Sequence, residues 1–257
     1  YVVKALFKGT KLVLVGDTDQ LPSVGPGCVL KDFIDSKQIP CVKLNKIFRQ
    51  AMQSKIIVNS HKVNEGINFL QEKEENKNEL NDFIFEEERN SAEIVNKILK
   101  EYSLDKQIIT PSKKGDLGTK NLNKLIQEKF NPLNVMKNEK KFGEVIFREG
   151  DKVMQTKNNY DIMWRRDSEI SSGIFNGEMG IIEKINENLG EIKIKFDDEK
   201  VAFYGFQDLD QLEHSYAITV HKSQGSEFSE VIFPVYQAAP MLLTRNLLYT
   251  GMTRAKD

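Results

Sequence analysis

Cysteine and histidine are scarce in this sequence of 257 residues, which contains two cysteines and three histidines. Cys28 and Cys41 form no CxxC pair, and the histidines are scattered along the chain. A disulfide framework needs a dense set of cysteines, and a zinc site needs clustered Cys or His ligands. We therefore expect no metal site in this chain. We also expect the protein to reside in a reducing compartment.

Long apolar runs are also absent. A helix needs roughly 18 to 20 consecutive apolar residues to cross a bilayer, and no stretch approaches that length. The apolar run at the start of the chain is interrupted by Lys4, Lys8 and Lys11. The sequence therefore favours a cytoplasmic protein that neither spans a membrane nor is secreted.

The charge balance excludes a disordered chain but hides an uneven distribution. Apolar residues make up 39% and charged residues 29%, with 37 basic against 38 acidic side chains. Residues 106–166 carry fourteen basic and seven acidic side chains, whereas residues 72–101 carry five basic and ten acidic ones. The basic segment could attract a polyanion or could be a solvated lysine-rich surface, and composition alone favours neither interpretation.

Alternating apolar patterns predict an α/β protein with an all-β insertion. Residues 11–15 (KLVLV) have the pattern of a buried parallel strand whose end meets a turn-rich loop at residues 17–27. Further strands are expected at residues 82–86, 107–110 and 230–235. Helices are expected at residues 28–35, 51–65, 91–101, 122–130 and 241–255, the third with Ser91 as its N-cap. Residues 212–219 fit a helix or a strand. Short alternating runs between residues 144 and 206 predict the small β insert.

Polar residues follow the first predicted strand in the segment GDTDQLPSVG, residues 16–25. In open α/β sheets, ligands bind at the carboxyl ends of the strands. Gln20 in such a loop could donate to a phosphate oxygen or orient a water molecule. The alternative is an Asx-type turn, in which Asp17 and Asp19 only accept from backbone N–H groups.

Arginine is used sparingly, since only seven of the 37 basic residues are Arg. Arg49 in IFRQ and Arg254 in YTGMTRA each lie beside apolar or aromatic residues. Phosphate recognition favours the bidentate guanidinium. A structural ion pair is the alternative for each.

Residues 216–228 (YAITVHKSQGSEF) contain several side chains that can donate hydrogen bonds, close in sequence to one glycine. Thr219, His221 and Gln224 could donate to phosphate and sugar oxygens, and Glu227 could accept from a ribose hydroxyl. No Cys/His or Ser/His/Asp set accompanies His221, so nucleophilic catalysis is disfavoured.

In this order and spacing, these segments resemble the second half of a superfamily 1 DNA helicase of the RecD/TraA type. KLVLVGDTDQLPSVGPG resembles helicase motif III, LNKIFRQ motif IV, AITVHKSQGSEF motif V and LYTGMTRAK motif VI. Secondary similarities are IITPSKKG, DKVMQTKNNYD and IFNGEMG. The resemblance extends over nearly the whole chain.

The resemblance implies an α/β fold with a RecA-like parallel sheet of the P-loop NTPase type and an inserted small SH3-like β-barrel. Residues 1–48 would be the tail of a first RecA-like domain. Residues 49–143 and 207–257 would form the second, and residues 144–206 the barrel. ATP would bind between the two RecA-like domains, and single-stranded DNA would cross both.

The resemblance also implies roles for individual residues. Gln20, Arg49 and Arg254 would act on the ATP γ-phosphate, with the arginines as fingers. The nucleotide would also be contacted by Asp17, Gly225, Glu227 and Gly251. DNA would be contacted by Thr110, Ser112, Thr219, His221 and Gln224.

One departure from the family pattern stands against these matches. The sequence has no GxxxxGK[ST] and no Asp-Glu pair at the end of a buried strand before Gly16. We therefore expect a truncated chain whose parent binds ATP and Mg²⁺, whereas the chain alone neither hydrolyses ATP nor holds a cofactor tightly. The expected partners are single-stranded DNA, ATP and recombination or conjugation proteins, with no membrane. The alternative function is a non-catalytic α/β module that binds DNA or protein.

Overall fold

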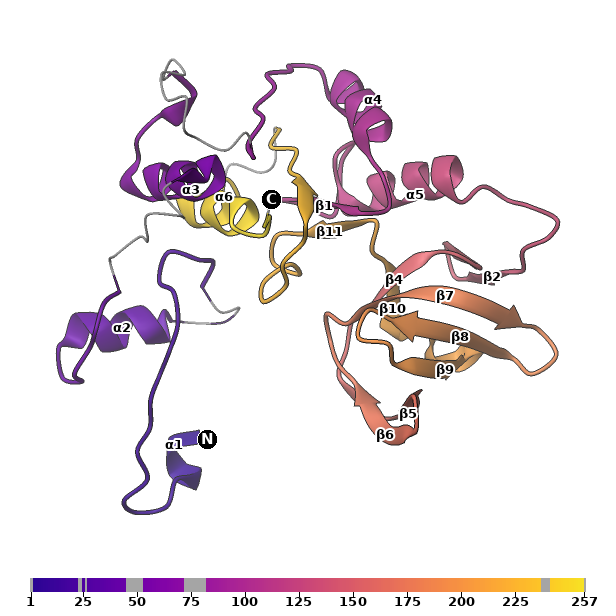
Figure 1. The fold of residues 1–257 in the computed structure, drawn as a ribbon, viewed down its shortest axis with the longest axis horizontal. Coiled ribbons are helices and arrows are strands. Elements are labelled where there is room, and N and C mark those ends of the chain that lie inside the picture. The colour runs from indigo at the N-terminus through magenta and orange to yellow at the C-terminus, as the bar shows by residue number, and fades with distance from the viewer. Residues whose placement is uncertain are drawn as a thin grey trace.

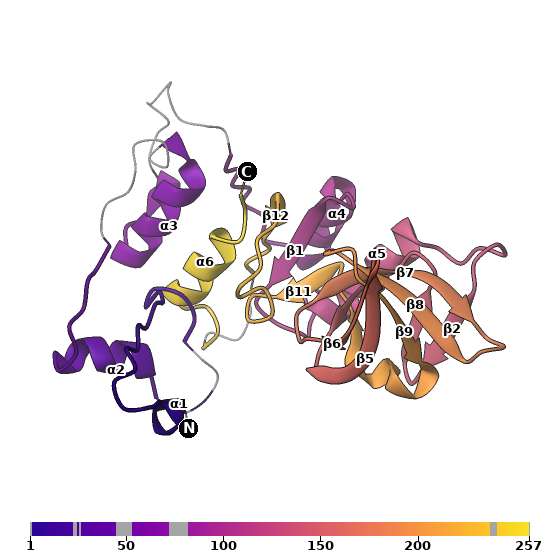
Figure 2. The ribbon, with the colours of Figure 1, turned by 60° about the horizontal axis from the view of Figure 1, so that its bottom comes forward.

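A parallel sheet and a larger antiparallel sheet organise the chain (Figure 1). The computed structural model describes residues 2–22, 25, 27–44, 53–71, 82–236 and 241–256. In both ribbon views the parallel sheet lies between the antiparallel sheet and the N-terminal segment that carries α1 and α2 (Figure 2).

The α-helices come before and after the antiparallel sheet in the sequence. They are α1 (Val2–Ala5), α2 (Val29–Ser36), α3 (Lys55–Glu65), α4 (Ser91–Glu101), α5 (Thr119–Phe130) and α6 (Arg245–Met252), with 3₁₀ turns η2 (Phe69–Gln71) and η3 (Phe206–Gln211). Of the helices in the described ranges, none has the length and apolar character needed to cross a bilayer. Helices α3 and α6 pack side by side.

The parallel sheet has the order β11-β1-β12, from β1 (Lys106–Thr110), β11 (Ala217–Thr219) and β12 (Glu230–Ile232). Ile108 and Ile109 in β1 are fully buried, as expected for a strand covered on both faces. The predicted strand at residues 107–110 is therefore confirmed. The segment at residues 230–235 is a shorter strand than predicted.

Two helices next to this sheet follow the predicted patterns. In α5, Leu122 and Ile126 lie on one face and are fully buried in a cluster with Ile108. Helix α4 spans the predicted residues 91–101, but its N-cap is Asn90 and not Ser91. The Asn90 side chain accepts from the backbone N–H of Ala92 at 2.9 Å, while the Ser91 hydroxyl donates to Asp116 at 2.7 Å.

The antiparallel sheet has seven strands in the order β10-β4-β7-β8-β9-β5-β6. Its strands are β4 (Lys152–Gln155), β5 (Asn159–Arg166), β6 (Glu169–Ile174), β7 (Met179–Asn186), β8 (Glu191–Phe196), β9 (Val201–Gly205) and β10 (Leu212–His214), and β2 (Glu139–Phe142) pairs with β3 (Val145–Arg148) in a separate ribbon. Alternate residues of β8 are buried, which fills one side of the sheet. Among the described strands the edges β10 and β6 do not pair with each other, so this ladder does not by itself confirm the SH3-like barrel that we expected.

Strands β5 and β6 form a hairpin that the sequence patterns did not predict. Their pairing register shifts between Asn159 and Met163, which marks a β-bulge. The bulge breaks the strict alternation on which the strand prediction depends. Trp164 remains buried on the inner face of the hairpin, with the Lys200 ammonium over its ring.

The two sheets are joined where β10 leads into β11. Residues 212–219, which fit a helix or a strand, form two short strands in different sheets. Met154 of β4 packs in one cluster with Ile109 and Ile218 of the parallel sheet. This apolar contact fixes the antiparallel sheet against the α/β part of the chain.

A buried carboxylate lies at the same junction. Asp151 is fully buried and accepts from Gln127 of α5 and from Asn131, the C-cap of that helix, at 2.6 and 2.7 Å. The Tyr216 hydroxyl donates to it at 2.9 Å, and His214 lies 3.0 Å away. Burial alone would raise the pKa of Asp151, but the hydrogen bond and charge of His214 and the other donors outweigh burial and lower it.

Two predicted strands are wrong. Residues 11–15 are extended but unpaired, and Val15 is 93% exposed, because no strand of the described residues lies beside them. Residues 82–86 are also irregular, with Ile84 and Phe85 exposed. In both segments the apolar pattern is that of a strand, but a strand requires a hydrogen-bonding neighbour.

Candidate functional site: a lysine-lined groove and a docked polar loop

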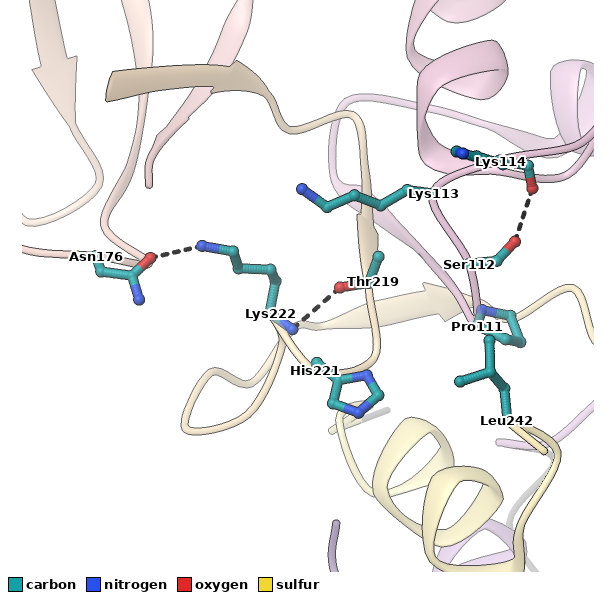
Figure 3. Close-up of a pocket in the computed structure, with 9 residues that line it drawn as sticks. All are labelled: Pro111, Ser112, Lys113, Lys114, Asn176, Thr219, His221, Lys222 and Leu242. Carbon is teal, nitrogen blue, oxygen red and sulfur yellow. Dashed lines mark hydrogen bonds between the residues drawn. The ribbon is translucent and has the colours of Figure 1, made fainter. Parts of the chain in front are cut away.

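An open groove of about 630 Å³ lies between the α/β part and the antiparallel sheet (Figure 3). One wall is the loop at residues 111–114, which follows β1. The floor carries Thr219, His221 and Lys222 from the turn after β11, and Asn176 enters from the loop between β6 and β7. Because β1 and β11 are parallel neighbours, their carboxyl ends bring both loops to one edge of the sheet.

The groove is electropositive. Lys113, Lys114 and Lys222 line it, and no Asp or Glu does. Lys113 forms an exposed ion pair with Glu213 at 3.1 Å, and Lys222 donates to the Asn176 side-chain oxygen at 2.7 Å. Burial lowers the pKa of Lys222, with Lys113 adding to the shift and Glu213 opposing it. Cations at this density attract a polyanion.

The predicted DNA-binding residues divide into two sets. Ser112, Thr219 and His221 line the groove together, and the His221 ring is exposed. Thr219 accepts from the Lys222 backbone N–H at both its carbonyl and its hydroxyl, which tightens the turn. Thr110 lies below the surface, fully buried, with its hydroxyl donating to the Leu117 carbonyl at 2.6 Å.

A second polar assembly forms where residues 17–21 dock onto α6. Asn246 donates through one amide nitrogen to the carbonyl oxygens of Thr18, Asp19 and Gln20, at 3.3, 2.9 and 3.1 Å. Thr250 accepts from the backbone N–H of Leu21 at 2.9 Å.

Gln224 continues this assembly from the turn after β11. Its amide donates to the Leu21 carbonyl at 2.9 Å, so its described partner is the docked loop. Segments that resemble motifs III, V and VI therefore meet in space, although Leu21 lies 203 residues from Gln224 and 229 residues from Thr250 in sequence.

Asp17 and Gln20 lie at the exposed side of this assembly. The Asp19 backbone N–H donates to the Asp17 carboxylate at 2.9 Å, which is the Asx-type turn of the alternative interpretation. Gln20 and the Tyr249 hydroxyl also donate to this carboxylate, each at 3.2 Å. Burial and the Asp17 charge raise the pKa of Tyr249 to about 12.

Arg254 is not free in this arrangement. Its side chain is 7% exposed and donates to the backbone carbonyls of Thr250 and Ser226 at 3.1 and 2.9 Å. A further N–H donates to the Thr253 hydroxyl at 3.2 Å. In this conformation the guanidinium stabilises the turn that follows α6 by hydrogen bonds to backbone carbonyls.

The other nucleotide-binding candidates lie on the segments that meet at this turn. Gly225 has a φ of +83°, a conformation that L side chains rarely adopt. Glu227 is exposed and pairs with Lys256 at 3.4 Å. A Cβ on Gly251 would lie 2.4 Å from the Phe233 ring, so close helix packing accounts for this glycine. Arg49 lies outside the described residues.

Sequence reasoning missed several residues of the site. Lys113, Lys114 and Asn176 lie in the segments IITPSKKG and IFNGEMG, whose similarity to the family was visible but whose side chains carried no assigned role. Asn246 and Tyr249 precede the residues assigned in motif VI. Only the fold shows that Asn246 anchors a loop more than 220 residues away.

The described side chains do not complete a nucleotide site. Among the residues that the structure describes, no group of three Asp, Glu, His or Cys could hold a metal ion. Three of the guanidinium N–H donors of Arg254 already have protein partners. In this conformation the protein therefore engages most of the donors of the Arg254 guanidinium.

The chain thus combines a parallel α/β sheet and an inserted antiparallel sheet with a lysine-lined groove between them. Three family models match the chain. They are described as an ATP-dependent RecD-like DNA helicase SH3 domain at residues 122–196, a UvrD-like helicase C-terminal domain at residues 214–257 and an AAA domain at residues 2–80.

Individual relatives agree with these models. The chain is 34% identical over its whole length to the ATP-dependent RecD2 DNA helicase of Deinococcus radiodurans, and spans about a third (33%) of that protein. Two crystal structures of Bacteroides Pif1, one bound to ssDNA and one in complex with ADP-AlF3 and ssDNA, have TM-scores of 0.51 and 0.50. They are 16% and 18% identical to the chain, cover 97% and 94% of it, and are matched over 61% and 59% of their own length.

Together, the three family models and the RecD2 relative support a RecD-type superfamily 1 helicase portion in this chain. Its fold class is α/β with a parallel sheet and an SH3 domain, as predicted.

Proposed function

We propose that residues 1–257 form part of an ATP-dependent DNA helicase that moves 5′ to 3′, and that the lysine-lined groove holds the single strand during translocation. The observation that carries this proposal is the groove itself. It brings Lys113, Lys114 and Lys222 together with exposed His221 at the junction of two structural units.

The groove chemistry suits a strand of any sequence. Ammonium groups and hydroxyls contact phosphate oxygens, which every nucleotide carries, whereas sequence readout needs contacts with base edges. A translocating enzyme must pass over all sequences, so it needs contacts of the first kind. The names of the RecD2 and Pif1 relatives, which mention a DNA helicase and ssDNA, support this assignment.

The docked loop and α6 supply the nucleotide side of the proposal. Gln20, Arg49 and Arg254 are the candidates for contact with the γ-phosphate, and a pair of cations would stabilise charge on the transferring group. For Arg254 this requires a rearrangement, because its guanidinium now donates to Thr250 and Ser226. Asp17, Gly225, Glu227 and Gly251 remain candidates for other nucleotide contacts.

ATP and Mg²⁺ belong in this proposal to the complete helicase. A phosphate cradle requires the GxxxxGK[ST] segment, which residues 1–257 lack. We therefore propose that the chain alone does not hydrolyse ATP. When bound in the complete protein, ATP supplies the free energy for movement along DNA.

Unwinding by the complete helicase tests the proposal. With Mg²⁺ and ATP, we expect separation of duplexes that carry a 5′ single-stranded tail and none of blunt duplexes or those with a 3′ tail. Lys222→Gln removes one phosphate contact and should raise the DNA concentration at half-maximal ATP turnover about tenfold, the value of one charged hydrogen bond. Lys100→Gln, at an exposed lysine of α4 outside the groove, is the matched control.

The alternative of a non-catalytic binding module predicts a different result. A module would bind DNA or protein without any DNA-stimulated ATP turnover. Unwinding from a 3′ tail would instead leave the helicase assignment standing and overturn the polarity.

A further inference from the structure

An exposed aromatic pair lies on the antiparallel sheet, where Phe175 directly precedes the groove residue Asn176. Tyr160 is 67% exposed and Phe175 is 39% exposed. Their ring centroids are 5.6 Å apart with an interplanar angle of 72°, an edge-to-face arrangement. Two large rings in solvent beside a basic groove call for an explanation beyond packing, because their apolar faces remain open.

The backbone around the pair is built to hold the rings in this place. Tyr160 lies within the register shift of the β5–β6 hairpin, between Asn159 and Met163, and such irregularities in a ladder redirect side chains. Gly173 has a φ of +104°, and a Cβ there would lie 3.0 Å from the tip of the Phe175 ring. The absent side chain at Gly173 leaves room for that ring.

The pair is joined to the groove through its neighbours in sequence. Phe175 precedes Asn176, which lines the groove and accepts from the Lys222 ammonium at 2.7 Å. The Asn176 backbone N–H donates to the Asn158 side chain at 2.9 Å, which ties the segment before β5 to the segment after β6, next to the two aromatic residues.

We propose that Tyr160 and Phe175 form a stacking surface for an unpaired base of the strand whose phosphates occupy the groove. This inference rests on the proposed function. The occupant is a base of single-stranded DNA because a phosphate track and an aromatic face lie side by side, as ssDNA-binding sites combine them. Every base has a π face, so stacking is compatible with the sequence-independent groove, whereas the bases of a duplex already stack on one another.

The test is fluorescence anisotropy of residues 1–257 with labelled oligothymidylate and with an abasic oligonucleotide of the same length. The abasic strand keeps the phosphates and removes the bases. Tyr160→Ala should weaken binding to oligothymidylate about 5- to 100-fold, the value of stacking one base. It should leave abasic binding and the salt dependence unchanged.

Control variants separate stacking from folding. Tyr160→Phe keeps the ring and should bind as the parent chain does. Ile170→Ala removes an exposed apolar side chain elsewhere on the same hairpin and should have no effect. Phe175→Ala should repeat the loss seen with Tyr160→Ala, and a thermal melt of each variant reports its folding.

The outcomes are distinguishable from failure of the proposed function. Binding with the expected salt dependence but equal affinity for Tyr160→Ala would overturn the stacking surface and leave the groove in place. Equal losses on both oligonucleotides would show that Tyr160 supports the groove and does not stack. No binding of either oligonucleotide would count against the groove itself. In that case the aromatic pair would fit an apolar protein segment better than a base.

Discussion

Asp151 carries the largest concentration of polar contacts at a single residue of the structure described. Two side-chain amides, a tyrosine hydroxyl, His214 and the Arg148 backbone N–H converge on its buried carboxylate. A carboxylate held in this way stabilises the junction between α5 and the antiparallel sheet only while it is ionised.

Replacing Asp151 by Asn should therefore lower the free energy of unfolding by about 3 to 5 kcal/mol, because donors that faced a carboxylate lose their acceptor. The pKa of Asp151 lies below its ordinary value of 3.8 in the folded chain. Its contribution is thus complete above pH 3.8 and is lost as the pH falls through the lower, folded pKa.

Urea unfolding at pH 7 and at several values below pH 4 measures this effect. The difference between the parent chain and Asp151→Asn should shrink as the pH falls. Asp161→Asn changes an exposed carboxylate of β5 and should stay within about 0.5 kcal/mol of the parent. A difference that is independent of pH would show that the carboxylate charge is not what stabilises the junction.

At the residue scale, the sequence could indicate which positions bear chemistry but not how their donors are used. Ser112, Thr219 and His221 were predicted together and lie together in the groove. Thr110 and Arg254 came from the same reasoning, yet their donors are satisfied by the backbone of the protein. The acceptor to which a hydroxyl or a guanidinium donates depends on tertiary contacts. A pattern along the sequence does not identify that acceptor.

At the scale of elements, β7 and β8 pack so closely that a side chain at Gly180 has no space. A Cβ there would lie 2.5 Å from the Lys195 carbonyl oxygen and 2.8 Å from the Phe196 Cα. These neighbours are backbone atoms of the paired strand, so they cannot move aside without breaking the ladder between the strands.

Gly180→Ala should lower the free energy of unfolding by about 1 to 3 kcal/mol, the range for overpacking. The matched control is Gly205→Ala in β9, where the nearest atoms belong to the flexible end of the Gln207 side chain. That variant should change the free energy of unfolding by less than about 1 kcal/mol. Thermal melts of both variants make the comparison, and equal destabilisation would contradict the close approach of β7 to β8.

Elements with a strong local pattern were predictable from the sequence, and those that depend on a distant partner were not. Helix α5 was predictable because Leu122 and Ile126 bury one apolar face of the helix. Strand β1 was predictable because residues 107–110 form a short continuous buried run. Residues 11–15 carry the same kind of pattern and remain unpaired, because pairing is decided by a neighbouring strand. The β5–β6 hairpin was missed because its bulge interrupts the alternation.

At the scale of the whole molecule, the groove depends on how the two sheets are fixed to each other. The contact of Met154 with Ile109 and Ile218 and the network around Asp151 both lie at this junction. They hold Asn176 opposite the loop at residues 111–114, so that lysines from distant segments face the same space. The sequence predicted a β insert but not that its loop would complete the groove.

The most direct test of the account is the salt dependence of oligothymidylate binding by residues 1–257. If the groove holds phosphates through Lys113, Lys114 and Lys222, the logarithm of the binding constant should fall linearly with the logarithm of salt concentration. Each single-strand phosphate contact contributes about −0.7 to the slope, so contacts from the three lysines should give a slope of about −2. Lys222→Gln should reduce its magnitude by about 0.7, with Lys100→Gln unchanged. Binding that is insensitive to salt, or a slope that Lys222→Gln leaves unaltered, would contradict the assignment of the groove to single-stranded DNA.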